Sequence, residues 1–121
     1  MSAPIFVVED NPMYSRFIKL KLDEKINNKV KFFTNAEEAI AQLHHKPKII
    51  ILDYMLGTGM NGLQAIDKIK KILLNVPIIM VSSQKDIEVA IDVLRAGVHS
   101  YIVKDENAPQ KIIDTILELT N

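Results

Sequence analysis

Five short runs of consecutive apolar residues constrain the fold of this chain more than any other feature. They are rich in isoleucine, valine and phenylalanine, and they do not alternate with polar residues. Such runs are typical of strands buried on both faces of a parallel sheet. They cover residues 5–8, 30–33, 49–52, 78–81 and 101–103.

After each run comes a segment in which apolar residues recur at helical spacing. The apolar positions are Met13, Phe17 and Leu20; Ala36, Ile40 and Leu43; Leu63, Ile66, Ile69 and Ile72 or Leu73; Ile87, Ala90, Ile91 and Leu94; and Ile112, Ile113, Ile116 and Leu119. Asn35 with Glu38 is typical of a helix start, Pro12 and Pro109 suit first helical turns, and Gly97 suits a helix end. The pattern predicts an α/β protein with a (βα)₅ order.

The size and charge of the chain narrow the classes of protein further. Its 121 residues are enough for one core, so we expect a single domain over residues 1–121. Cysteine is absent, and the histidines at 44, 45 and 99 have no zinc-like spacing. Fifteen basic and fifteen acidic residues cancel, which argues against direct nucleic acid or membrane binding by bulk charge. No signal-like or membrane-spanning stretch occurs, which predicts a soluble, cytoplasmic protein.

Residues suited to phosphate chemistry follow four of the five runs. Glu9 and Asp10 follow the first run, Asp53 the third, Ser82 the fourth and Lys104 the fifth. The carboxyl ends of parallel strands line the ligand crevice of such a sheet, so these side chains are expected to meet. Carboxylates that lie close together repel unless a cation binds between them, and a small set of hard oxygen ligands suits Mg²⁺. The sequence therefore predicts a magnesium-dependent phosphoryl site.

Within this predicted site Asp53 is the candidate nucleophile, because a carboxylate can attack phosphorus to give an acyl phosphate. Ser82 is placed to donate a hydrogen bond to a phosphoryl oxygen, and Lys104 to neutralise its charge. Taken singly, each residue has a structural alternative. Asp10 or Asn11, for example, also suits the N-cap of the helix expected to start near Pro12.

Four segments resemble the receiver domains of bacterial two-component response regulators, of the chemotaxis-regulator type. They are residues 7–11, residues 50–56 with Gly62 downstream, residues 77–83 and residues 96–104. The resemblance covers nearly the whole chain. It implies a doubly wound, flavodoxin-like fold with a five-stranded parallel sheet in the order 2-1-3-4-5.

The resemblance also implies a function and a set of site residues. Asp53 is expected to accept a phosphoryl group from a sensor histidine kinase or a phosphotransfer protein. The implied Mg²⁺ ligands are the carboxylates of Glu9, Asp10 and Asp53 and the backbone carbonyl of Met55. Ser82 and Lys104 are implied to engage the phosphoryl group, and Ser82 with the aromatic Tyr101 to form the switch.

The expected partners follow from the same resemblance. A receiver switches conformation to control a downstream effector or output domain, in some cases as a phosphorylation-dependent homodimer. Such a domain is a phosphoacceptor that catalyses its own phosphotransfer and slow dephosphorylation, and it is not an enzyme acting on a separate substrate.

Two places depart from the receiver pattern. Asp105 follows Lys104 where receivers usually have proline, so this loop is expected to approach the site differently. The loop from Leu56 to Gly62 lacks the usual proline, contains Gly57 and Gly59, and is one residue longer than the commonest spacing. We expect it to be more mobile, with a shifted start for the helix that follows.

The sequence gives less support to two other classes of function. A phosphatase of the haloacid dehalogenase type needs a second acid two residues after Asp53, where this chain has Met55. A flavin or nucleotide carrier needs glycine or hydroxyl residues after the first strand, where this chain has acids. His44 and His45 are expected to form an exposed pair, His99 to be structural, and the lysines at 68, 70 and 71 to form a solvated helix face.

Overall fold

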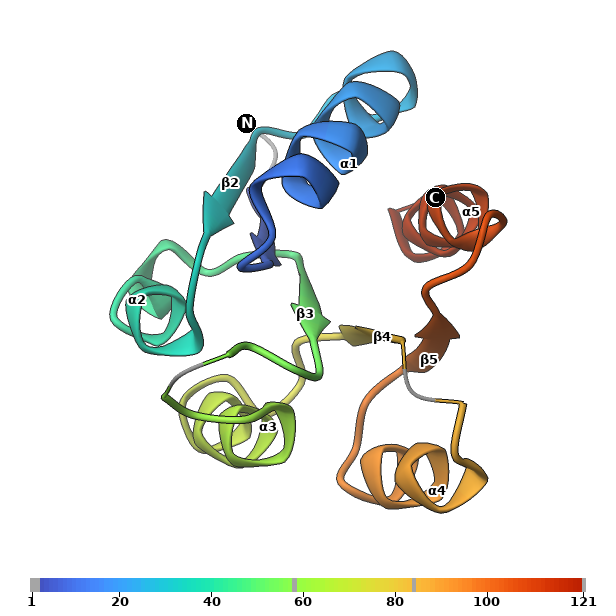
Figure 1. Cartoon of the computed structure of the whole chain (residues 1–121). Helices are drawn as coiled ribbons and strands as arrows, with labels where there is room; N and C mark the ends of the chain where they lie inside the picture. Colours follow the sequence, from blue (N-terminus) through green and yellow to red (C-terminus); the bar gives the residue numbers. More distant parts are fainter. Residues whose placement is uncertain (1–2, 58, 84, 121) are drawn as a thin grey trace.

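The sheet has the predicted strands and the predicted order. A computed structural model of the chain describes residues 3–57, 59–83 and 85–120. Five parallel strands pair in the order β2-β1-β3-β4-β5, which confirms the flavodoxin-like order (Figure 1). The strands are β1 (Ile5–Val8), β2 (Val30–Phe33), β3 (Ile49–Asp53), β4 (Ile78–Ser82) and β5 (Ser100–Val103). β3 lies at the centre, so its last residue, Asp53, lies at the middle of the sheet's carboxyl edge.

Helices cover both faces of the sheet. They are α1 (Pro12–Lys25), α2 (Ala36–Ile40), α3 (Gly62–Ile72), α4 (Ile87–Arg95) and α5 (Ala108–Thr120). Helices α1 and α5 lie on one face, and α2, α3 and α4 lie on the other (Figure 1). Within the described ranges, no helix is long and apolar enough to span a bilayer.

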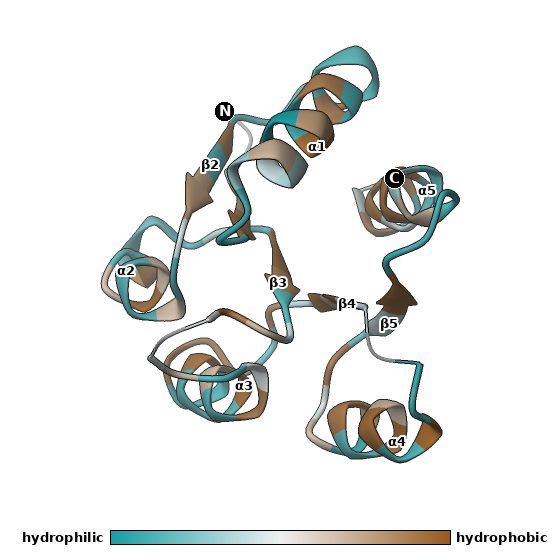
Figure 2. Ribbon diagram, in the orientation of Figure 1, coloured by the Kyte–Doolittle hydropathy of each residue, from teal (hydrophilic) through white to brown (hydrophobic). Residues whose placement is uncertain are grey.

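Each face of the sheet has its own apolar core, because successive strand residues point to opposite faces. Phe6, Ile50 and Met80 belong to the core under α2, α3 and α4. Ile51 and Ile79, one residue out of phase, belong to the core under α1 and α5. All are at most 3 % exposed, and Figure 2 shows the strands as strongly hydrophobic segments. The continuous apolar runs are thus explained by burial on two sides.

Side-chain caps fix where the helices begin. Asn11 accepts hydrogen bonds from the backbone of Met13 and Tyr14, so it and not Asp10 is the cap of α1. Asn35 accepts one from the backbone N–H of Glu38, as predicted. At α3, Asn61 and Gln64 form a reciprocal capping box. This box was not predicted, and it fixes the start of α3 after the longer loop. Gly97 follows α4 with a φ of +103°, as expected for a helix end.

The predicted apolar face of α1 is wrong. Met13, Phe17 and Leu20 are 81 %, 43 % and 59 % exposed, whereas Ile18 and Leu22 are buried. The spacing was helical, but the neighbouring stripe of the same helix packs against the sheet. Periodicity alone cannot choose between two overlapping apolar stripes.

The second helix is shorter than its apolar spacing predicts. α2 ends at Ile40, and Leu43 begins a separate 3₁₀ turn, η1 (Leu43–His45). The backbone N–H of Gln42 donates to the carbonyl of Ala39, a tighter bond than the α-helical pattern. Leu43 is buried in the core, as its apolar character suggests, but it lies in the 3₁₀ turn and not in the predicted helix.

Candidate phosphoacceptor site

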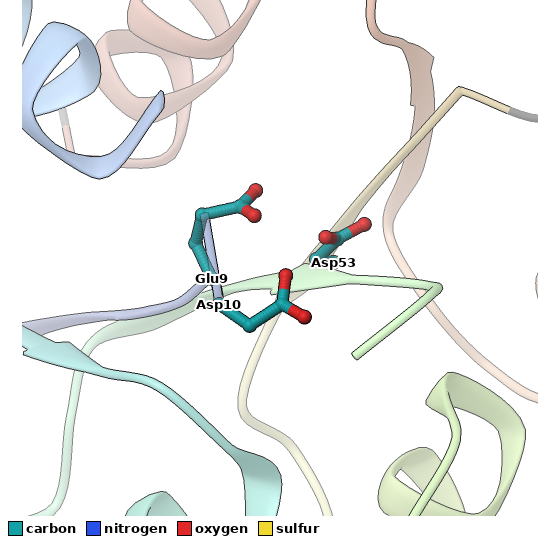
Figure 3. Close-up of side chains that lie close together, drawn as sticks. All are labelled: Glu9, Asp10 and Asp53. Carbon is teal, nitrogen blue, oxygen red and sulfur yellow. The ribbon is translucent and has the colours of Figure 1, made fainter. Parts of the chain in front are cut away.

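Three carboxylates meet at the carboxyl edge of the sheet (Figure 3). Glu9 and Asp10 follow β1, and Asp53 ends β3, the strand paired beside β1. One oxygen from each carboxylate lies within 4.8 Å of the others. Glu9 and Asp53 are both 5 % exposed, while Asp10 is exposed. The predicted convergence of these residues is present in the structure.

Lys104 reaches the same place from the end of β5. Its Nζ lies 2.6 Å from Oε1 of Glu9 and 3.1 Å from Oδ2 of Asp53. Only 18 % of the lysine side chain is exposed, so these ion pairs are poorly screened by water. One ammonium therefore bridges two of the three carboxylates and leaves an uncompensated negative charge at the site.

Backbone N–H groups hold the carboxylates in place. The N–H of Asn11 donates to Oε2 of Glu9 at 3.0 Å, and the N–H of Met55 donates to Oδ1 of Asp53 at 3.3 Å. The Met55 side chain is exposed, so its connection to the site is through its backbone. The contact found is made by the Met55 N–H, so the role expected for its carbonyl as a metal ligand stays a prediction.

The environment of Asp53 favours its protonated form. Burial and then the charge of Glu9 raise its pKa to about 7, against the opposing effect of Lys104. Burial lowers the pKa of the Lys104 ammonium, but its bonds and ion pairs with Glu9 and Asp53 raise it by more in total. Lys104 thus offsets part of the repulsion between the two buried carboxylates.

The donor set fits magnesium. Glu9, Asp10 and Asp53 supply hard carboxylate oxygens, and at least one of these residues faces solvent, which suits an ion that keeps several waters. Among the described residues, this is the group of acidic and histidine side chains close enough to share a metal. His44 and His45 are both exposed, with their ring centroids 4.2 Å apart, which confirms the expected exposed pair.

Ser82 and Tyr101 lie on the neighbouring strands. Ser82 ends β4 with its side chain fully buried, and its carbonyl accepts a hydrogen bond from the backbone N–H of Lys104 at 2.7 Å. Tyr101 is half-buried in β5, pairs with Met80 and packs against the core under α4. The structure therefore places the predicted hydroxyl and the predicted aromatic residue on adjacent strands beside the site.

The two departures from the receiver pattern have local structural solutions. The Lys104–Asp105 peptide bond is trans, and Asp105 accepts a hydrogen bond from the N–H of Asn107 just before α5. The lysine still reaches both carboxylates. In the longer loop, Gly57 and Gly59 have φ values of +66° and +90°, which glycine adopts readily. Thr58 lies outside the described residues.

Two further residues, Tyr14 and Gly57, lie beside the site and were not predicted from the sequence to do so. Tyr14 lies under Lys104, with the ammonium 4.5 Å from its ring centroid. Gly57 approaches so closely that a Cβ there would lie 2.8 Å from Oδ2 of Asp10. No sequence signal marks Tyr14, because its contact with Lys104 depends on how α1 is rotated against the sheet.

The family model and the sequence relatives agree on one family. The family model described as the response regulator receiver domain matches residues 5–117. The nitrogen assimilation regulatory protein NtrX of Azorhizobium caulinodans is 29 % identical over 117 residues, 95 % of this chain and 26 % of that protein. The response regulator protein VraR of Staphylococcus aureus is 31 % identical over 113 residues, 89 % of this chain and 52 % of that protein.

A solved structure agrees with these sequence relatives. The crystal structure of NtrX from Brucella abortus superposes with a TM-score of 0.85 at 28 % identity, over 99 % of this chain and 27 % of that one. The chain thus spans about a quarter to a half of the length of these relatives.

Proposed function

This chain belongs to the family of response regulator receiver domains, and from that premise we propose that it accepts a phosphoryl group on Asp53. A histidine kinase or phosphotransfer protein is the donor. The observation that carries the proposal is the position of Asp53 at the end of the central strand, between Glu9, Asp10 and the Lys104 ammonium. The relatives named above are regulators, which supports a signalling domain over an enzyme with its own substrate.

Each residue of the site has a role in this proposal. An Asp53 oxygen attacks the phosphorus of the donor, the bond to the donor's leaving group breaks, and an acyl phosphate forms. Lys104 stays close enough to neutralise a phosphoryl oxygen, and the Ser82 hydroxyl supplies a hydrogen bond. The same groups would then act in slow self-catalysed dephosphorylation.

Magnesium is the cofactor in this proposal. Glu9, Asp10, Asp53 and the backbone carbonyl of Met55 would hold it. When bound, the ion neutralises charge on the phosphoryl oxygens as they approach the carboxylates.

The domain extent, location and partners belong to the same proposal. Residues 1–121 act as one receiver domain in the cytoplasm, where a sensor kinase is its donor. Phosphorylation then changes how the domain contacts an effector, an output domain or a second copy of itself. The even charge balance supports contact with protein and not direct contact with nucleic acid or membrane.

Intact-mass analysis tests the phosphoacceptor directly. Incubation with a small phosphodonor and Mg²⁺ should add one phosphoryl group to the wild-type chain and none to Asp53→Asn. The matched control is Asp67→Asn, which removes an exposed aspartate paired with Lys71 on α3 and should leave the modification unchanged. Equal modification of the wild type and Asp53→Asn would show that the phosphoacceptor is a different residue.

A further inference from the structure

The ammonium of Lys104 has a third neighbour besides the two carboxylates. Tyr14, in the first turn of α1, presents its ring face to Nζ, 4.5 Å from the ring centroid. An ammonium carries three N–H donors, and Glu9 and Asp53 occupy two directions around it. The ring occupies a further side, so residues of β3, α1 and the β1–α1 turn together enclose the ammonium.

The ring differs from the carboxylates in one important respect. Its attraction for a cation comes from the fixed quadrupole of the aromatic face, so it does not depend on the chemical state of Asp53. Phosphorylation would change the charge and bonding of Asp53, and with them one of the two ion pairs that hold the lysine. Lysine has a long, flexible side chain that needs several contacts to stay in one rotamer. A contact that persists through the reaction would therefore keep the lysine in place while its ion pair with Asp53 changes.

The Tyr14 hydroxyl does not explain why a tyrosine lies here. The hydroxyl oxygen is buried and has no hydrogen-bond partner among the described residues. Burial raises its pKa, so the side chain stays neutral and its face stays available to a cation. Tyr14 also lines a small cavity together with Glu9, Asp53 and Ile112, so the residue lies directly beside the site. The ring itself contacts the Lys104 ammonium and, at 6.3 Å between ring centroids, the ring of Phe17.

We propose that Tyr14 is a positioning residue of the phosphoacceptor site, whose ring holds the Lys104 ammonium between Glu9 and Asp53. This inference rests on the proposed function, because Lys104 is assigned there to the phosphoryl group. It adds a residue of α1 to the site and states its role: the ring fixes the lysine in place before and during phosphotransfer.

Two substitutions separate the ring from the hydroxyl. Tyr14→Phe keeps the aromatic face and should behave as the wild type, whereas Tyr14→Leu removes the face. The matched control is Phe17→Leu on the same helix. Phe17 also lies near a lysine, with Lys21 Nζ 5.8 Å from its ring centroid, but it is 43 % exposed and does not line the site. Its ring lies 6.3 Å from that of Tyr14, so Phe17→Leu also shows whether losing a neighbour of Tyr14, without losing the Tyr14 ring, affects Lys104.

The first measurement needs neither metal nor phosphate. In NMR spectra of the metal-free protein, the ε-methylene protons of Lys104 should be shifted upfield by the Tyr14 ring current. The shift should persist in Tyr14→Phe and Phe17→Leu and disappear in Tyr14→Leu. The second measurement is the rate of phosphorylation by a small phosphodonor with Mg²⁺. It should fall roughly three- to tenfold in Tyr14→Leu and stay within about twofold of wild type in the other two variants.

The outcomes distinguish this inference from the proposed function. If the wild type is phosphorylated and Tyr14→Leu reacts at the same rate, Tyr14 does not position the lysine, and the phosphoacceptor proposal still stands. If the wild type accepts no phosphoryl group, the proposed function fails, while the ring-current shift alone decides whether Tyr14 holds Lys104. Should Tyr14→Leu not fold, Tyr14→Met provides an unbranched replacement without a ring for both measurements.

Discussion

At the scale of single residues, the site is a balance between repulsion and one bridging cation. Glu9 and Asp53 are both buried and both contact Lys104, so a single positive charge serves two carboxylates. Burial and the neighbouring carboxylate make the ionised form of Asp53 unfavourable in the folded, metal-free protein. This gives the site a pH dependence that opposes the usual behaviour of a stabilising aspartate.

We expect the metal-free protein to lose stability as the pH rises from about 4 to about 7. Asp53 has a folded-state pKa of about 7 and a reference value of 3.8, so in this window the folded state holds a proton that the unfolded state has released. The contribution of Asp53 is complete below the reference value and lost above the folded-state pKa. The free energy of unfolding falls by at most about 1.4 kcal/mol per pH unit through this contribution. Urea unfolding in the presence of a chelator, repeated at several pH values, measures this decline.

Asp53→Asn provides the comparison for this pH profile, because an amide does not titrate. The free energy of unfolding of the variant should lack the decline that Asp53 contributes between pH 4 and 7. Titrating groups away from the site affect both proteins alike, so the difference between the two profiles reports Asp53 together with its charged neighbours Glu9 and Lys104. Parallel profiles for the two proteins across this range would contradict the raised pKa.

Individual site residues differ in how far the sequence predicts them. Asp53 and Lys104 directly follow apolar runs, so strand direction alone brings them to one edge. Tyr14 follows no run, and its contact with Lys104 depends on the rotation of α1 about its axis. That rotation is set by packing, and the sequence periodicity selected the wrong stripe of the helix. The error in the helix face and the missed site residue therefore have the same physical origin.

At the scale of elements, strands were easier to predict than helices. A strand buried on both faces gives the same apolar run whichever way it faces, and every predicted strand agrees with the structure to within one residue at its ends. For a surface helix the prediction must also identify the face that packs against the sheet, and for a short helix it must identify the residue at which the helix ends. α1 shows the first kind of error, and so does α4, whose expected apolar residues Ile87, Ile91 and Leu94 are exposed while Val93 is buried. α2 shows the second, because the tight turn at Gln42 overrides local periodicity.

The loop between β3 and α3 gives a prediction about metal binding. Gly57 has a φ of +66°, and a Cβ at this position would lie 2.8 Å from Oδ2 of Asp10. In Gly57→Ala the Asp10 carboxylate must move away, so we expect Mg²⁺ affinity to fall roughly tenfold, a loss of about 1.4 kcal/mol. The left-handed backbone adds a folding cost of about 1–2 kcal/mol. Isothermal titration with Mg²⁺ and thermal unfolding measure the two effects separately.

Gly97 supplies the matched control for this substitution. Its φ of +103° also disfavours alanine, but its Cβ would lie 3.6 Å from Lys70 at a distance from the acidic cluster. Gly97→Ala should therefore lower stability without changing Mg²⁺ affinity. The close approach of Gly57 has no role in metal binding if both variants bind Mg²⁺ as tightly as the wild type.

At the scale of the whole molecule, metal binding and folding are linked, because only the folded sheet brings Glu9, Asp10 and Asp53 together. We expect millimolar Mg²⁺ to raise the melting temperature. At a free Mg²⁺ concentration a hundred times Kd, binding adds about 2.7 kcal/mol to the free energy of unfolding. Asp10→Asn should remove most of this gain and preserve or raise the stability of the metal-free protein, since it removes a repelling charge. Asp67→Asn on α3 is the control. Unchanged Mg²⁺ affinity in Asp10→Asn would mean that the ion binds elsewhere.

The last prediction concerns how phosphorylation reaches the surface. Ser82 and Tyr101 lie on adjacent strands, and Tyr101 packs against the core under α4, whose outer residues Ile87 and Ile91 are 72 % and 40 % exposed. If the Ser82 hydroxyl moves toward a phosphoryl oxygen, the Tyr101 ring can turn inward and reshape the α4–β5–α5 face. Beryllofluoride with Mg²⁺ should then change amide exchange across that face as well as at Asp53, and Ser82→Ala should confine the change to the site. Changes restricted to the site loops in the wild type would leave the phosphorylation chemistry intact and rule out this route to the partner surface.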